Sequence, residues 1–217
     1  MGKNRLEAFS DGVLAIIITI MVLEMKVPHG ADWQTLQTLQ MLIPVFFSYV
    51  LSFIYIGIYW NNHHHLFHAV KHVSGGVLWA NLHLLFWLSL LPFVTGWMGE
   101  NHFAPLPMAL YGIALAMAGI AYWILVHVII STEGKDSLVA KAVGKDFKGI
   151  ISVVVYAIAV PLAFVNVWFA EIGYIGIALL WLIPDRRIEK TLSEYSHSEH
   201  STSEHSQPEN SQLKSSK

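Results

Sequence analysis

Cysteine is absent from the 217-residue sequence, and charged residues are scarce, at 13% of the chain. Without cysteine, the protein cannot form disulfides, thiolate metal sites or iron–sulfur clusters, and it has no cysteine nucleophile. Soluble domains usually contain about 25% charged residues, whereas this chain is 54% hydrophobic with a mean hydropathy of +0.50. Its net charge of −2 argues against a polyanionic partner such as a nucleic acid. This composition excludes a disordered chain, a nucleic-acid-binding protein and an ordinary soluble enzyme, and it predicts an integral membrane protein.

Common catalytic and sensory motifs are missing as well. The sequence contains no G-x-x-x-x-G-K-[ST] phosphate loop, no G-x-S-x-G nucleophile elbow and no H-E-x-x-H zinc helix. No predicted helix carries Lys or Arg at every third position, so we expect no voltage sensor. We therefore expect neither an enzymatic activity nor a cofactor.

Long apolar runs dominate what is present. A helix needs about 20 mainly apolar residues to cross a bilayer. Four such runs occupy residues 9–27, 41–62, 76–98 and 107–131. A further run after residue 149 is long enough for two short crossings, and we expect the turn between them at Ala170–Gly173. The sequence predicts an all-α membrane protein with six transmembrane helices.

The distribution of basic residues supports six crossings. Basic residues collect on the cytoplasmic side of membrane proteins. With the N-terminus inside and the ends alternating, Lys26 is the single basic residue of thirteen that falls outside. We therefore expect both termini in the cytoplasm and a transmembrane domain at residues 1–192. Residues 193–217 contain nine serines among Glu, His and Gln, which predicts a disordered cytoplasmic tail.

Several polar residues lie where apolar ones are expected. In the first run these are Arg5, Ser10 and Asp11, with Phe9 between them. Ionisable groups in a membrane are costly and indicate function, and Asp11 needs a partner that Arg5 or a histidine of another helix can supply. The alternative is that Arg5 reaches the lipid headgroups while Ser10 and Asp11 only cap the helix start.

The end of the second run is rich in histidine. His64 and His68 can share one helix face, which suggests a metal site, but no Asp or Glu lies nearby to complete the ligand set. We favour hydrogen bonding by His63 and its neighbours to Arg5 and Asp11. Asn81 of the third run lies at the same depth, so we predict a buried polar network between the first three helices.

The later part of the first run is apolar with a helical spacing. Ile16, Thr19 or Ile20, and Leu23 form a stripe along one face. Taken alone, this spacing is typical of a face that contacts lipid or the protein core.

The polar first helix also makes the sequence recognisable. The segment Arg5–Ile16 (R-L-E-A-F-S-D-G-V-L-A-I) resembles the Arg-x-x-x-Phe-Ser-Asp signature of the transmembrane protein 175 family of potassium channels. Leu23–Pro28 resembles the end of that family's first helix. The pattern Trp60-x-x-His63-His64-x-x-Phe67 resembles the end of its second helix, and Asn81-Leu82 with Leu91-Pro92-Phe93 resembles its third.

The resemblance implies a function and an assembly. One six-helix repeat implies the prokaryotic form, a homotetramer in the plasma membrane that conducts K⁺ in preference to Na⁺ as a leak-like channel. Four copies of the first helix would line its pore, with the constriction at Ile16 and the next pore-facing positions at Thr19 and Leu23. The resemblance also implies a polar network that holds the pore helix, formed by Arg5, Phe9, Ser10, Asp11, His63 and Asn81.

Two other functions remain open at this point. A proton-coupled or metal-ion transporter would use the histidines His63–His65 and would lose function on their removal. A non-conducting membrane scaffold would recruit partners through the serine-rich tail and would carry no flux.

Overall fold

The protein is all-helical throughout the residues that its computed structural model describes, which are residues 2–27, 33–143 and 146–182. The helices are α1 (Lys3–Met21), extended by the 3₁₀ turn η1 (Val22–Glu24), α2 (Trp33–Ala69), α3 (Gly75–Ser89), α4 (Leu91–Glu100), α5 (Pro105–Glu133), α6 (Leu138–Val143), α7 (Phe147–Leu162) and α8 (Val167–Leu182). The predicted tail, residues 193–217, lies outside the described residues.

Four helical segments are long and apolar enough to cross a membrane. They are Lys3–Glu24, Leu42–Ala69, Gly75–Glu100 and Pro105–Glu133, and each contains most of one of the four runs predicted from the sequence. The third segment joins α3 and α4 through Leu90. Pro92 has no backbone N–H, so it cannot continue the hydrogen-bond ladder across this joint. Two shorter apolar helices, α7 and α8, follow with 16 residues each.

The turn between α7 and α8 is not where the sequence analysis predicted it. It lies at residues 163–166, while Ala170–Gly173 forms part of α8. Asn166 explains the earlier turn, because its Oδ1 accepts a hydrogen bond from the Trp168 N–H, 3.0 Å away, and so satisfies a free donor at the start of α8. Because of this shift, α8 has a full 16 residues rather than about a dozen.

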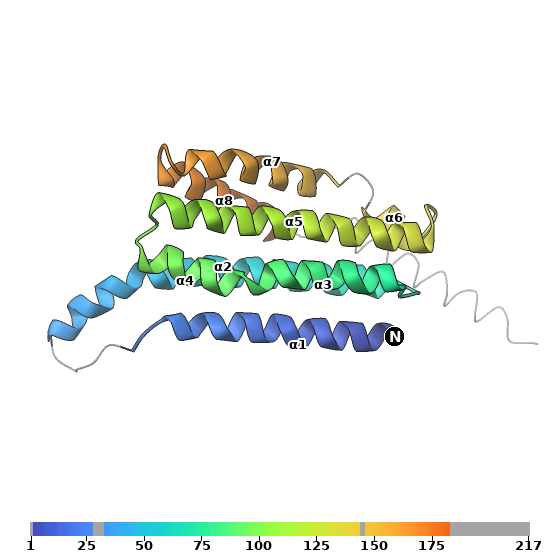
Figure 1. The fold of residues 1–217 in the computed structure, drawn as a ribbon, viewed down its shortest axis with the longest axis horizontal. Coiled ribbons are helices and arrows are strands. Elements are labelled where there is room, and N and C mark those ends of the chain that lie inside the picture. Colours follow the sequence, from blue (N-terminus) through green and yellow to red (C-terminus); the bar gives the residue numbers. More distant parts are fainter. Residues whose placement is uncertain (1, 28–32, 144–145, 183–217) are drawn as a thin grey trace, which may run out of the picture.

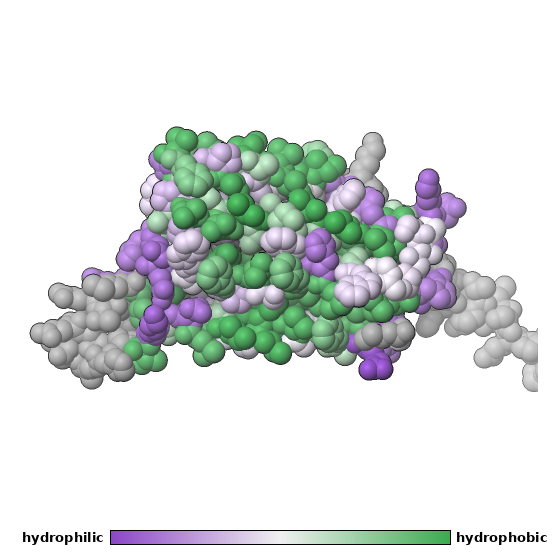
Figure 2. Space-filling view, viewed as in Figure 1, coloured by the Kyte–Doolittle hydropathy of each residue, from purple (hydrophilic) through white to green (hydrophobic). Residues whose placement is uncertain are grey.

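The helices form a bundle in which α1 lies at one side and α7 at the other (Figure 1). The α5 helix packs against both α3 and α7 and therefore occupies the centre, while α1 packs against α2, α3 and α4. Apolar side chains cover most of the face seen in Figure 2, and hydrophilic residues gather mainly toward its two ends. This is the surface expected of a protein that lies in a bilayer.

Contacts at the two ends of the bundle show which segments meet there. At one end, Lys3 Nζ donates to the carbonyl of His68, 3.1 Å away, and Glu133 Oε1 accepts from the backbone N–H groups of Lys71 and His72. At the other end, Lys26 Nζ forms an ion pair with Glu100 Oε1 at 2.8 Å. Lys3 and Lys71 thus share one end of the bundle and Lys26 lies at the opposite end, in agreement with the alternation used to count the crossings.

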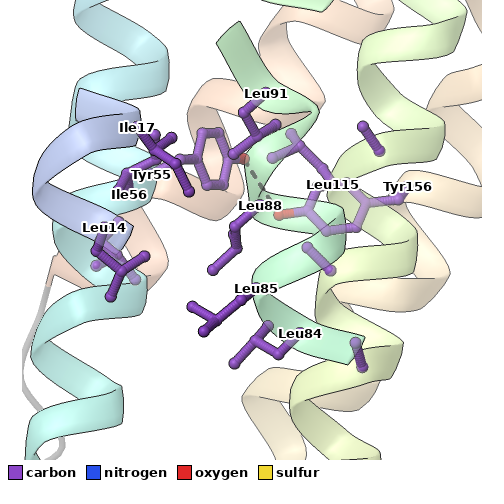
Figure 3. Packing of buried hydrophobic residues seen from close by; sticks show 14 of the residues in the cluster. Leu14, Ile17, Tyr55, Ile56, Leu84, Leu85, Leu88, Leu91, Leu115 and Tyr156 are labelled. Carbon is purple, nitrogen blue, oxygen red and sulfur yellow. Dashed lines mark hydrogen bonds between the residues drawn. The ribbon is translucent and has the colours of Figure 1, made fainter. Parts of the chain in front are cut away.

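The core between the helices is built from apolar side chains and a few tyrosines. Leu14 and Ile17 lie on the side of α1 that faces this cluster (Figure 3). The Tyr156 hydroxyl of α7 donates to the Tyr55 hydroxyl of α2 at 3.2 Å, and Tyr55 in turn donates to the carbonyl of Tyr174 in α8. These bonds tie the last two helices to α2, so the second half of the chain forms one body with the first.

Candidate functional site

The two faces of α1 differ sharply in their surroundings. The buried face follows a spacing of three or four residues and consists of Leu6, Ser10, Leu14, Ile17 and Met21. On the opposite face, Phe9, Ile16 and Leu23 are 47%, 57% and 74% exposed, and Thr19 is exposed between them. One face therefore attaches the helix to its own subunit, and the other leaves apolar side chains about half or more exposed in the single subunit.

A chain of hydrogen bonds crosses the buried side of α1. Ser10 Oγ donates to the Leu6 carbonyl at 2.9 Å, which leaves this oxygen free to accept a bond from Asn81 Nδ2, also at 2.9 Å. Asn81 Oδ1 lies 2.8 Å from His63 Nε2. Because the amide nitrogen of Asn81 donates to Ser10, its oxygen must accept from His63, and this assigns the proton to Nε2 of the imidazole.

This chain joins three helices in the buried interior of the subunit. Ser10 and Asn81 are fully buried and His63 is 2% exposed. The His63 ring also packs on Phe67, with ring centroids 4.5 Å apart. Each of the three side chains makes a hydrogen bond with the next one, and none carries a formal negative charge, so the chain links α1, α2 and α3 without a buried ion pair.

Asp11 has a different partner from the one predicted. Its Oδ1 accepts a hydrogen bond from Trp60 Nε1 at 3.1 Å, and not from Arg5 or a histidine. The Trp60 ring stacks on His64, with centroids 6.2 Å apart. Arg5 is exposed and its side chain donates no hydrogen bond to another described residue. Trp60 was not predicted as the partner of Asp11, because a tryptophan within an apolar helix does not by itself indicate a hydrogen bond. Its position directly before the polar segment Asn61–His65 was the one available sign.

The histidines divide between the core and the surface. His63 is buried, while His64 and His68 are exposed and their ring centroids lie 6.4 Å apart. Within the described part of the chain, no group of three His, Cys, Asp or Glu side chains is arranged to hold a metal ion. The tail histidines lie outside that part.

The far end of α1 is attached to α4. Glu24 packs against Gly96, where a methyl group would stand 3.0 Å from the Glu24 Oε2 atom. The hydrogen bond between Lys26 and Glu100 raises the pKa of the Lys26 ammonium above its ordinary value, since the carboxylate stabilises the charged form. Both contacts fix the C-terminal end of α1 and the residues just after it to α4, and neither was anticipated from the sequence.

Comparisons with known proteins place this arrangement in a family. The model of the endosomal/lysosomal potassium channel TMEM175 matches residues 5–92. A potassium channel of Chryseobacterium sp. (strain P1-3) is 57% identical over 194 residues, which are 89% of this chain and 100% of that protein. The chain belongs to the TMEM175 family.

Two further relatives of this TMEM175 chain are informative. A potassium channel of Streptomyces collinus is 37% identical over 132 residues, which cover 56% of this chain and 63% of that protein. A crystal structure of a lysosomal potassium-selective channel TMEM175 homolog from Chamaesiphon minutus superposes with a TM-score of 0.70 at 27% identity, over 83% of this chain and 96% of that one. The fold similarity thus extends well beyond the residues that match the family model.

Replacement of Asn81 by leucine, which has a similar volume, removes both hydrogen bonds through which Asn81 links Ser10 of α1 to His63 of α2. We expect Asn81→Leu to lower the stability of the purified protein by about 1–3 kcal/mol, because Ser10 and His63 then stay buried without their partner. Thermal unfolding in detergent measures this loss. Asn101→Leu is the control, because Asn101 is exposed and its side-chain amide donates to the carbonyl of Trp97, one turn earlier in the chain. Equal melting temperatures for the two variants would contradict the role assigned to Asn81.

Proposed function

We propose that this protein is a potassium-selective channel that conducts ions passively through a pore lined by α1. Its relatives from Chryseobacterium and Streptomyces are named potassium channels, and the homologue from Chamaesiphon minutus is described as potassium-selective. The observation that carries the pore assignment is the exposed face of α1, which presents Phe9, Ile16 and Leu23 away from the subunit. The permeant ion is K⁺, and the proposal involves no reaction and no cofactor.

The proposed channel is a homotetramer in the plasma membrane of a prokaryote. Each subunit would cross the membrane six times, with both termini in the cytoplasm, a channel domain at residues 1–192 and a cytoplasmic tail at 193–217. The position of Lys3 and Lys71 at one end of the bundle, opposite Lys26, supports this orientation. The α1 helix is apolar on both faces but packs against its own subunit on one face only. Its other face must therefore be covered by lipid or by the α1 helices of further subunits.

Four copies of α1 around a central axis would form the narrow part of the pore. We assign the constriction to Ile16, with Thr19 and Leu23 as the next positions toward the outer end. The Thr19 hydroxyl donates to the carbonyls of Ala15 at 2.9 Å and Ile16 at 3.1 Å. Because its proton is directed to its own helix, the oxygen presents lone pairs outward, where a ring of four can contact a cation.

The chemistry of a hydrophobic ring favours K⁺ over Na⁺. An ion that passes Ile16 must give up part of its water shell, and the apolar isoleucine side chains provide almost no favourable interaction to replace that hydration. K⁺ binds its water less tightly than Na⁺, so partial removal of the water shell costs K⁺ less free energy. Such a filter discriminates less than a cage of backbone carbonyls, and it can close when water leaves the apolar neck.

Residues on the inner half of α1 would position the pore helix rather than contact the ion. Ser10, Asn81 and His63 form the buried chain, and the bond from Trp60 holds Asp11. In this proposal Arg5 and Phe9, which are exposed in the single subunit, complete the polar network only in the assembled tetramer.

The transporter alternative is not favoured. It requires His63–His65 to be available to a moving proton or metal ion, whereas His63 is 2% exposed and its Nε2 atom is occupied by Asn81.

Reversal potentials test the proposed function. The purified protein in a planar bilayer, with K⁺ on one side and Na⁺ on the other, is expected to carry a passive current that reverses close to the K⁺ equilibrium potential. A reversal near zero would indicate a channel without K⁺ selectivity. Absence of current from a well-folded tetramer would contradict the channel assignment.

Substitution of Ile16 tests the constriction. Ile16→Asn places four polar side chains in the neck, so we expect a several-fold larger conductance and a K⁺/Na⁺ permeability ratio closer to one, because the ion keeps more of its water. Ile158→Asn serves as the control, since Ile158 is 54% exposed on α7, away from α1. Unchanged currents in Ile16→Asn would place the constriction elsewhere.

A further inference from the structure

A cavity lies between α2, α5, α7 and α8, and no α1 residue lines it. The space inside it that the centre of a water-sized group can occupy is about 40 Å³, which is enough for a small ligand head group of a few heavy atoms and not for a large molecule. The described residues that line it are Tyr55, Ile58, Tyr59, Asn62, Gly119, Tyr122, Asp146, Gly149, Ser152, Tyr156 and Trp181. The cavity is therefore separate from the proposed pore.

Each of the four helices contributes at least one aromatic ring to the lining. The rings are Tyr55 and Tyr59 from α2, Tyr122 from α5, Tyr156 from α7 and Trp181 from α8. The Tyr59 and Tyr122 rings meet edge to face, with centroids 6.2 Å apart. An enclosure of several aromatic rings attracts an organic cation, because the electron-rich ring faces stabilise positive charge while the ring carbons contact its alkyl groups.

Asp146 is the one residue with a formal charge among the described residues that line this cavity. Its Oδ1 accepts a hydrogen bond from the Gly149 N–H at 2.9 Å and so caps the start of α7. The carboxylate gives the cavity a negative charge next to its aromatic walls. Lys148 Nζ lies 5.7 Å from the centroid of the Trp181 ring, so this ring already has one ammonium group as a neighbour, and a ligand has to compete with that charge.

Two further details favour an occupant. No hydrogen bond joins the Tyr59 hydroxyl to another described residue, although this residue lines the cavity. Gly119, in the middle of α5, also lines the cavity and has no side chain to fill it. A methyl group at this position would lie 3.8 Å from the Tyr59 hydroxyl oxygen. The cavity thus offers one unused hydroxyl and a space that a single methyl group would narrow without a clash.

We propose that this cavity binds a small organic ammonium ion, which the aromatic rings surround and Asp146 neutralises. The ammonium group comes either from a soluble amine or from the headgroup of an amine-bearing phospholipid. The site would give the protein a ligand that binds away from the ion path.

Choline and its uncharged carbon analogue 3,3-dimethylbutan-1-ol test the charge requirement, since the two molecules share one shape. With the full-length protein in detergent and calorimetry as the readout, we expect saturable binding of choline that is roughly tenfold or more tighter than that of the alcohol. Equal affinities, or no choline binding, would overturn the proposal.

Two variants locate the binding site. Asp146→Asn keeps the helix cap, because Asn and Asp cap helices equally well, and we expect it to weaken choline binding at least fivefold. Gly119→Ala reduces the space and is expected to weaken binding while it preserves the fold, since alanine favours a helix more than glycine does. Asp136→Asn changes an exposed carboxylate outside the cavity and should bind choline normally. Normal binding by both cavity variants would overturn the assignment.

Bilayer discs separate the two sources of the ammonium group. If the headgroup of phosphatidylethanolamine occupies the site, choline should bind several-fold more weakly in discs of this lipid than in discs of phosphatidylglycerol, and Asp146→Asn should abolish the difference. Equal choline binding in both discs would identify a soluble amine as the ligand.

Discussion

Everything proposed for conduction depends on the attachment of α1 to its subunit by one face only. On that face, Ser10, Asn81 and His63 form a continuous chain of hydrogen bonds that crosses three helices. A buried polar group that loses its partner costs about 1–3 kcal/mol, and the hydrocarbon interior contains no water to replace it. Rotation of α1 about its axis would break this chain, so the opposite face is fixed as the outward one.

Apolar contacts alone would hold α1 less specifically. Leucine and isoleucine side chains pack in many similar ways, whereas the bond from Asn81 to Ser10 exists in one rotation and one height of the helix. The contact of Glu24 with Gly96 and the ion pair of Lys26 with Glu100 add a second attachment at the other end. Between these two attachments lie Ile16 and Thr19, so the helix is held above and below the segment assigned to the neck.

The sequence predicted the features that depend on local pattern. The four long apolar helices follow from the length and hydropathy of each run. The similar depth of Ser10, His63 and Asn81 along the predicted membrane-spanning helices follows from the position of each residue within its run. The bond between Trp60 and Asp11 was missed, because it depends on how α1 and α2 face each other. The cavity was missed for the same reason, since its lining comes from helices far apart in sequence. The early turn at Asn166 was missed because a single capping bond decides it.

Accessibility of single cysteines along α1 tests the central claim most directly, and the natural chain contains no cysteine that would interfere. Ile16→Cys and Ile17→Cys differ by one position but lie on opposite faces, since Ile16 is 57% exposed and Ile17 is 4% exposed. A water-soluble cationic thiol reagent should block or change the current of Ile16→Cys and leave that of Ile17→Cys unaffected. Modification of Ile17→Cys with no effect on Ile16→Cys would contradict the assignment of the exposed face of α1 to the pore.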